Sequence, residues 1–200
     1  PSQWKTAGEG PLPEPTWTPF YLHEGGRLWE REHFPNEGSS SFSDSPWGRE
    51  HLEFSTPELV EETEVIGPVL LNFYASTTDT EVLWFVSLRE VDAQGKEKVL
   101  TRGWLRGSHR EVAPDRSKRW EPFHPHTRSE PLVPGKIYEF NIAIVATCNL
   151  FKAGSRIKLK IACCDDQPDN ALEAIAGGHV RRQSGSRVTV FHNDQYPSHL

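Results

Sequence analysis

Arg156-Ile157-Lys158-Leu159-Lys160-Ile161-Ala162-Cys163 is the stretch that decides the fold class, because basic and apolar residues alternate along it. Successive side chains of a β-strand point to opposite faces, so this pattern places Ile157, Leu159 and Ile161 on one face. The three basic side chains then lie on the other face. The stretch therefore predicts a strand with one side in the core and one side in solvent.

Similar patterns recur on both sides of this stretch. Residues 81–91 and 98–105 alternate on either side of the turn Asp92-Ala93-Gln94-Gly95, which predicts a hairpin with a glycine at positive φ. No segment keeps a helical period, and at most one helical turn is expected, over Ala171–Ala176. About eight strands are predicted, over residues 21–29, 50–55, 63–75, 81–91, 98–105, 137–145, 156–163 and 187–192.

This order of elements predicts an all-β chain, folded as a two-sheet sandwich of the jelly-roll type. A length of 200 residues with 36% hydrophobic side chains suits one good core or two small ones. We expect a single domain overall, in which residues 50–200 form the jelly roll. Residues 1–49 are expected to be an irregular arm rich in proline and tryptophan with a first short strand, and residues 35–48 to be a loop.

The net charge of −6 hides an asymmetry along the chain. Residues 1–100 carry 7 basic and 18 acidic side chains, whereas residues 101–160 carry 12 basic and 5 acidic ones. A basic block can bind nucleic acid, but no known binding motif accompanies it here. The block is more simply read as the complement of the acidic first half or of an acidic neighbouring domain. We therefore expect no nucleic-acid partner.

Neither a membrane span nor a leader is expected from the composition. No stretch approaches the roughly 20 apolar residues that a spanning helix needs, and the segment from Pro1 to Lys5 lacks the apolar core of a signal peptide. A cytoplasmic location is the expectation. Because proline rather than methionine comes first, we expect a fragment of a longer protein, with a processed terminus as the alternative.

Three cysteines suggest a reducing compartment rather than a disulfide framework. Cys163 and Cys164 are neighbours on a predicted strand and point to opposite faces, so they do not suit a mutual disulfide. A bridge from Cys148 to one of them stays open. We expect small buried side chains, and the absence of a CxxC motif leaves a zinc ribbon unsupported.

Nothing in the sequence supports catalysis by this chain. The serine nucleophile of an α/β-hydrolase needs a G-x-S-x-G elbow, and no serine here has glycine at both the −2 and +2 positions. Asp165, Asp166 and Asp169 form an oxygen-rich stretch, but their spacing matches no ordered calcium loop. We therefore expect no catalytic residue, no metal and no cofactor.

One face is a candidate for binding, and its residues are Trp104, His109, Trp120, His124 and His126. His124 and His126 are two positions apart, so their side chains would share a face in extended backbone. With His109 or Glu111 they could make a metal site. The tryptophans could instead form an aromatic platform for a sugar. Histidines satisfied within a loop, and tryptophans buried in the core, are the plain alternatives to these two readings.

Several motifs together resemble the C-terminal domain of X-Pro dipeptidyl peptidases and of the cocaine esterase (CocE/NonD) hydrolases. The resemblance is carried by residues 64–69, 79–80, 85–88, 100–111, 122–126, 130–135, 138–140, 151–157 and 196–200. Such ordered matches are more specific than any single motif. The segment from Cys163 to Arg182 departs most from the family pattern.

The resemblance implies a jelly roll similar to galactose-binding domains, packed on an α/β-hydrolase domain of the same parent chain. In that family the catalytic serine, aspartate and histidine lie upstream, so no catalytic residue carries over. It implies a non-catalytic accessory domain that braces the hydrolase, shapes the entrance of its active site and can support homo-oligomers. The alternative hypothesis is an autonomous carbohydrate-binding module.

Overall fold

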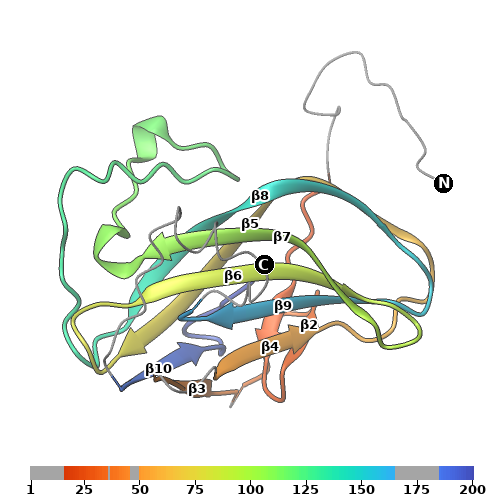
Figure 1. The fold of residues 1–200 in the computed structure, drawn as a ribbon, viewed down its shortest axis with the longest axis horizontal. Helices are drawn as coiled ribbons and strands as arrows, with labels where there is room; N and C mark the ends of the chain where they lie inside the picture. The colour runs from red at the N-terminus through yellow and green to blue at the C-terminus, as the bar shows by residue number, and fades with distance from the viewer. Residues whose placement is uncertain (1–15, 36, 46–49, 165–184) are drawn as a thin grey trace.

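The structure is a computed structural model, and it describes residues 16–35, 37–45, 50–164 and 185–200. Within these residues the regular secondary structure is almost entirely β-strand, with two short 3-10 turns, η1 (Gly107–His109) and η2 (Pro114–Arg116), both in the connection between β7 and β8 (Figure 1). The strands are β1 (Tyr21–His23), β2 (Arg27–Trp29), β3 (Ser39–Asp44), β4 (His51–Ser55), β5 (Thr63–Thr77), β6 (Leu83–Val91), β7 (Glu97–Arg106), β8 (Tyr138–Phe151), β9 (Arg156–Ala162) and β10 (Ser186–Phe191).

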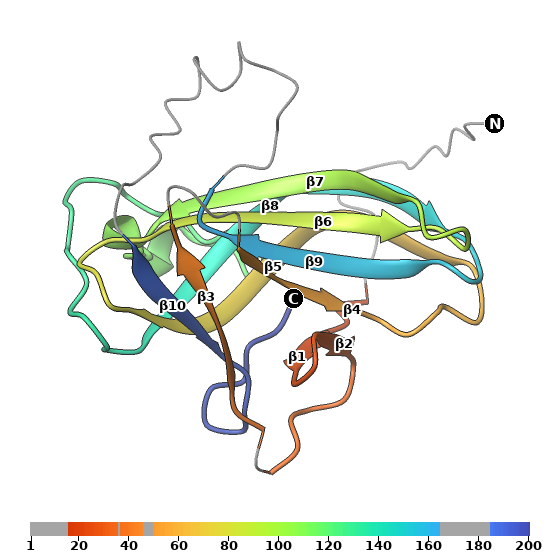
Figure 2. The same cartoon turned by 60° about the horizontal axis from the view of Figure 1, so that its bottom comes forward.

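Two sheets form a sandwich (Figure 2). One sheet has the order β1-β2-β4-β9-β6-β7, and the other has the order β3-β10-β5-β8. From β3 to β10 the chain passes repeatedly between the two sheets, and only the hairpin of β6 and β7 stays within one of them. This arrangement is a jelly roll of eight strands, to which β1 and β2 add one edge. The predicted fold class is confirmed, whereas a specific likeness to galactose-binding domains stays a prediction.

The inward faces of the strands supply the core, as the alternating patterns predicted. Ile157, Leu159 and Ile161 of β9 are buried, while the basic residues between them reach the surface. At the centre, Trp84 of β6 meets Phe73 and Phe140 of the opposite sheet, with ring centroids 4.8 and 5.2 Å away. Edge-to-face aromatic contacts of this kind stabilise a core beyond the area they bury.

The two sheets approach each other closely where β7 crosses β8. A Cβ atom at Gly103 would lie 2.7 Å from the carbonyl oxygen of Ala143 and 2.9 Å from Ile142 Cγ2. The hydroxyl of Thr101 donates a hydrogen bond to the carbonyl oxygen of Val145 across the same contact. Only glycine permits this backbone approach, so Gly103 fixes the position of β8, which carries much of the surface described below.

The first and last described segments pair beside β5. The amides of Phe20 and Leu200 donate to each other's carbonyl oxygens, and the amide of Leu22 donates to the carbonyl oxygen of Ser198. His199 makes the same reciprocal pair with Asn72 of β5. The C-terminal segment thus lies between β1 and β5 and joins the beginning of the described chain to the sandwich.

The structure differs from the expectations at β3 and at Cys148, and two further expectations fall on residues that it does not describe. Residues 39–44 form strand β3 although we expected a loop over residues 35–48, because pairing with β10 and the burial of Phe42 outweigh the low strand propensity of serine. None of the three cysteines forms a disulfide, and Cys148 is exposed rather than buried. The expected helical turn at 171–176 and the acidic stretch 165–169 lie outside the described residues.

Candidate functional site

A long connection between β7 and β8, residues 107–137, leaves the sandwich and carries four of the five predicted binding residues (Figure 1). The carboxylate of Glu81 fixes its beginning, since it accepts hydrogen bonds from the Ser108 amide at 2.9 Å and from Arg106 Nε at 2.8 Å. Burial would raise the pKa of Glu81, but these hydrogen bonds outweigh burial and lower it. Glu81 therefore fixes the position of the first residues of this connection, which is called the 107–137 loop below.

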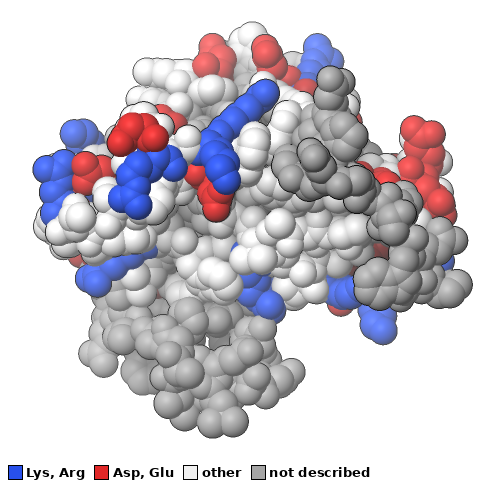
Figure 3. Space-filling view, turned by 90° about the horizontal axis from the view of Figure 1, so that it is seen from above, with Lys and Arg blue, Asp and Glu red and all other residues white. Residues whose placement is uncertain are grey.

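Internal contacts hold the loop in shape. Arg128 binds both carboxylate oxygens of Glu111, at 3.1 and 3.0 Å, and also contacts Glu130 at 3.1 Å. The guanidinium of Arg110 lies 4.3 Å from the ring centre of Tyr138, a cation–π contact that ties the loop to the start of β8. Basic and acidic side chains alternate at this end of the molecule, on the left of Figure 3. The loop is thus an ordered, charged projection.

The three predicted histidines lie together on this loop. Nδ1 of His126 is 3.2 Å from Nδ1 of His109, and the rings of His124 and His126 are 6.0 Å apart. Burial, with the nearby His109 and His124, lowers the pKa of His126. His124 differs from the other two, because its Nδ1 and Nε2 each lie 2.9 Å from a backbone carbonyl oxygen, of Glu111 and of Asn141. It therefore connects the loop to β8.

A metal site is not formed by these side chains. Because both nitrogens of His124 face carbonyl oxygens, neither points a lone pair toward His109 or His126. Glu111 is held by Arg128. Across the residues that the structure describes, no group of three or more His, Cys, Asp or Glu side chains is arranged to hold a metal ion.

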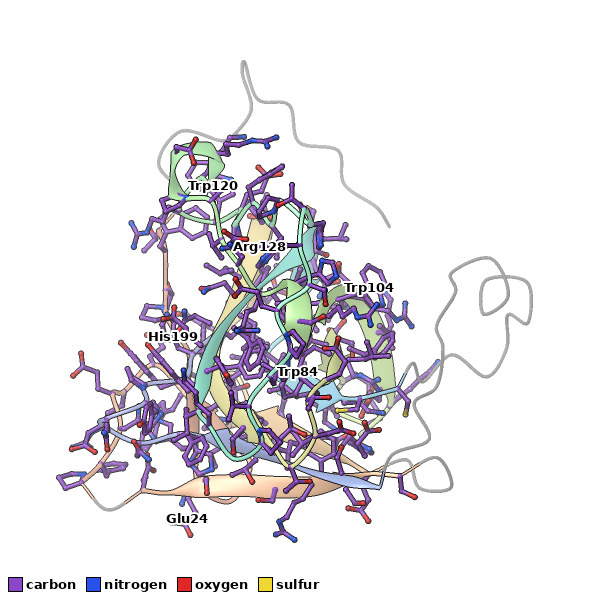
Figure 4. All side chains as sticks on the ribbon, turned by 90° about the vertical axis from the view of Figure 1, so that its left-hand side faces the viewer. Glu24, Trp84, Trp104, Trp120, Arg128 and His199 are labelled. Atoms are coloured by element: carbon purple, nitrogen blue, oxygen red, sulfur yellow. The ribbon has the colours of Figure 1, made fainter. Side chains whose placement is uncertain are left out.

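The two candidate tryptophans lie on different parts of the surface (Figure 4). Trp120 stacks on Trp17 with ring centroids 5.4 Å apart and an interplanar angle of 10°, which fastens the N-terminal arm to the 107–137 loop. Trp104 stands on the outer face of the six-stranded sheet, 47% exposed, beside Phe85, Ser87 and Ala162 in a shallow groove. The five predicted residues therefore do not share one face: Trp104 is separate from the other four.

The outer face of β5 and β8 is a second surface, which we did not single out from the sequence. Leu71 and Ile142 face each other in the core, so the next cross-strand pair, Leu70 and Ala143, faces outward. Opposite Gly67 and Val69, β8 contains one extra residue, so the side-chain directions of β8 change at this bulge while those of β5 do not. Phe151, opposite Thr63, is accordingly buried. The outward apolar side chains, called the β5–β8 strip below, are Ile66, Leu70, Ala143, Val145, Cys148 and Leu150.

A sequence signal for this strip does exist. Residues 65–71 contain apolar side chains in consecutive positions instead of strict alternation. Such a run is typical of a strand that is covered on both faces. The Gly67-Pro68 interruption by itself indicates a bend or an edge strand. That interpretation does not predict an outer face of β5 that is covered by a partner.

The part of the chain that the structure describes contains no helix of the length and hydropathy that a membrane span requires.

Comparison with known proteins gives one family and a consistent fold. A family model described as the X-Pro dipeptidyl-peptidase C-terminal non-catalytic domain matches residues 1–173. The cocaine esterase of Rhodococcus sp. strain MB1 Bresler is 21% identical over 242 aligned residues, which covers 99% of this chain and 39% of that protein. A candidate serine esterase of Mycobacterium bovis is 30% identical over 118 residues, which is 57% of this chain and 19% of that protein.

Solved structures share the fold over almost the whole chain. A CocE/NonD family hydrolase from Staphylococcus aureus superposes with a TM-score of 0.87 at 21% identity, covering 98% of this chain and 38% of that one. An aminopeptidase from a marine sediment Thaumarchaeota archaeon gives a TM-score of 0.76 at 17% identity, with the same coverage. The chain thus spans well under half of the length of each of these proteins. It belongs to the X-Pro dipeptidyl-peptidase C-terminal non-catalytic domain family, as found in hydrolases of the CocE/NonD type.

Proposed function

We propose that this chain is the accessory domain that braces an α/β-hydrolase domain of the same parent protein and shapes the entrance of its active site. The parent would form an acyl-enzyme on a serine, with the oxyanion hole in the hydrolase domain. Family membership supports the non-catalytic part of this proposal. The candidate serine esterase and the cocaine esterase among its relatives favour an ester as the substrate class.

The 107–137 loop is the observation that carries the entrance-shaping role. Long connections without strands are uncommon in compact domains, and ordered ones usually have a function. Here Glu81 holds the beginning of the loop and His124 fastens its middle to β8. The Trp17–Trp120 stack joins it to the arm that leads toward the N-terminal side of the chain. In a C-terminal domain that side leads to the catalytic domain.

The test is a comparison of variants in the full parent protein. Trp120→Ala should unfasten the loop from the arm, and we expect KM for a bulky acyl ester to rise roughly tenfold, equivalent to about 1.4 kcal/mol. KM for a small acetyl ester should change little, because the chemistry lies in the other domain. Lys98→Ala, an exposed change in β7 away from the loop, is the control. Equal effects on both esters, or none on either, would contradict the entrance-shaping role.

Glycan binding is a second candidate function, supported by one observation. The groove beside Trp104 combines two aromatic side chains, Trp104 and Phe85, with the polar Ser87 and Lys160, and sugars bind to such mixed surfaces. A glycan array would separate the two functions. Binding that disappears in Trp104→Ala but persists in Trp120→Ala would establish the carbohydrate-binding function, and absence of binding would leave the accessory role alone.

A further inference from the structure

The geometry of the β5–β8 strip points to the place where the two domains meet. We propose that the strip is the surface on which the catalytic domain of the same polypeptide docks, an inference that rests on the proposed function and makes it more specific. The 107–137 loop would then reach over the edge of this contact, since His124 anchors it to Asn141 on β8.

The strip is apolar where a solvent-facing sheet should be polar. An antiparallel sheet normally shows water a polar face, yet Val145 is 59% and Leu150 is 49% exposed. Ile66 and Leu70 contribute nothing to the core either: their neighbours Val65 and Val69 pack against it, whereas these two face away. Apolar side chains gathered in this way mark a contact surface.

On the opposite side of the sandwich, away from the groove at Trp104 and Phe85, charged side chains cover the sheet. On the outer face of the six-stranded sheet, Lys158 Nζ contacts Glu53 at 3.1 Å and Glu97 at 2.7 Å, and Arg89 also pairs with Glu97. Cross-strand ion pairs of this kind suit water. Away from that groove the two outer faces therefore differ in chemistry: one carries cross-strand ion pairs, and the other carries the apolar side chains of the β5–β8 strip.

The rim of the strip is polar, as in known interfaces. Glu64 lies directly opposite Leu150 at one end. At the other end, the side-chain amide of Asn72 donates to Glu139 Oε1 and to Asn141 Oδ1, both at 2.7 Å. Both ends carry carboxylates, so the complementary surface should be apolar with hydrogen-bond donors or basic side chains around it.

The size of the strip favours a tethered domain over a second copy of this chain. Stable contacts between separate molecules bury about 800 Å² on each partner, from roughly 20–30 residues, and the strip has six side chains. A covalently linked partner is present at an effective concentration in the millimolar range, so a smaller contact holds it. We therefore assign the catalytic domain of the same polypeptide as the occupant.

The cysteines of this chain provide the readout, measured in the full parent protein by thiol labelling and peptide mass spectrometry. Cys148 lies on the strip, Cys164 is half-buried away from it, and Cys163 is buried in the core. If the catalytic domain covers the strip, Cys148 should label slowly. Replacing Val145→Gln and Leu150→Gln together should raise its labelling rate by roughly tenfold, because two apolar contacts are lost. Cys163 should stay unlabelled, which shows that the fold is intact.

Trp29→Gln is the matched control, because it replaces an apolar strand residue of similar exposure, 40%, on the other sheet. It should leave the labelling of Cys148 unchanged. Rapid labelling of Cys148 in the unaltered parent, while Trp120→Ala still alters KM, would overturn the docking of the catalytic domain on the strip. The proposed function would then still stand. Rapid labelling together with no effect of Trp120→Ala would overturn both. Protection of Cys148 that disappears on dilution would assign the strip to a second copy and overturn the tethered partner.

Discussion

At the scale of single residues, His192 is a buried group that makes stability depend on pH. Its side chain is fully buried, Nε2 lies 2.9 Å from Ser40 Oγ, and Nδ1 has no hydrogen-bond partner within the described part of the chain. Burial lowers the pKa of His192, because an imidazolium loses hydration there. The folded state therefore favours the neutral form, and stability should decline as the pH falls below about 6.5, the ordinary value in the unfolded chain.

The corresponding variant is His192→Gln. It removes the titrating group, so the free energy of unfolding should fall less steeply between about pH 7 and pH 5 than in the unaltered chain. Urea unfolding at several pH values measures this slope. Burial also lowers the pKa of His33, so some acid sensitivity should remain. An unchanged slope would show that His192 does not titrate in this range.

Gly103 is a second residue whose environment predicts the effect of a substitution on stability. In Gly103→Ala the added methyl group would meet the backbone of Ala143 at 2.7 Å, and backbone cannot move aside as a flexible side chain can. The two sheets would have to separate locally, at a cost of about 1–3 kcal/mol of unfolding free energy. Gly38→Ala is the control, because nothing lies within 4 Å of its Cβ position. Equal stability of the two variants in urea unfolding would contradict the close approach of β7 and β8.

At the scale of elements, the sequence predicted those strands whose side chains alternate, because alternation follows directly from half-burial. β9 and the hairpin of β6 and β7 appear where expected, with Gly95 at φ +81° in the turn. β3 was not predicted, since four of its six residues are serine and its stability comes from a distant partner, β10. For the β5–β8 strip, the apolar run at residues 65–71 indicates only that β5 is covered on both faces, whereas the half contributed by β8 depends on the register of two strands far apart in the sequence, which no local pattern contains.

The 107–137 loop was predicted only as a cluster of suggestive residues. The sequence could place His124 and His126 near each other, but not show that His124 faces two backbone carbonyl oxygens, which belong to Glu111 and Asn141. That difference separates a structural anchor from a metal ligand. Trp104 and Trp120 are sixteen positions apart in the sequence, and only the end of β7 between them places them on different surfaces.

The anchoring role of His124 can be tested at this scale. His124→Ala leaves two carbonyl oxygens without their partner, at a cost of about 1–3 kcal/mol if water does not replace it. We expect faster amide hydrogen exchange within residues 109–130, while exchange in β9 stays slow. His126→Ala, which removes an exposed ring at the same loop, is the control. Similar exchange in both variants would mean that the loop is held by its other contacts, those of Glu81, Trp120 and Arg128.

At the scale of the whole molecule, the fold is completed by contacts between its first and last described segments. Residues 198–200 lie between β1 and β5, and their backbone makes hydrogen bonds to Phe20, Leu22 and Asn72. Ser198 is fully buried, accepts a hydrogen bond from the amide of Tyr74 and donates one to the carbonyl oxygen of Phe191. Removing this segment would take away the hydrogen bonds that join β1 to β5, although β1 would still pair with β2, and β5 with β8 and β10.

A chain that ends at Pro197 should therefore lose much of its stability. Each intramolecular hydrogen bond contributes about 0.5–1.5 kcal/mol, and a domain of this kind is stable by only about 5–15 kcal/mol in total. We expect a large fall in Tm by calorimetry, and faster hydrogen exchange in β1 as well as near Asn72, because one segment holds both. The variant His199→Ala keeps the backbone pairs and should stay close to the unaltered Tm. If the truncated chain matched it, β1 would be held to the sandwich by its contact with β4 through β2, and the C-terminal segment would be dispensable.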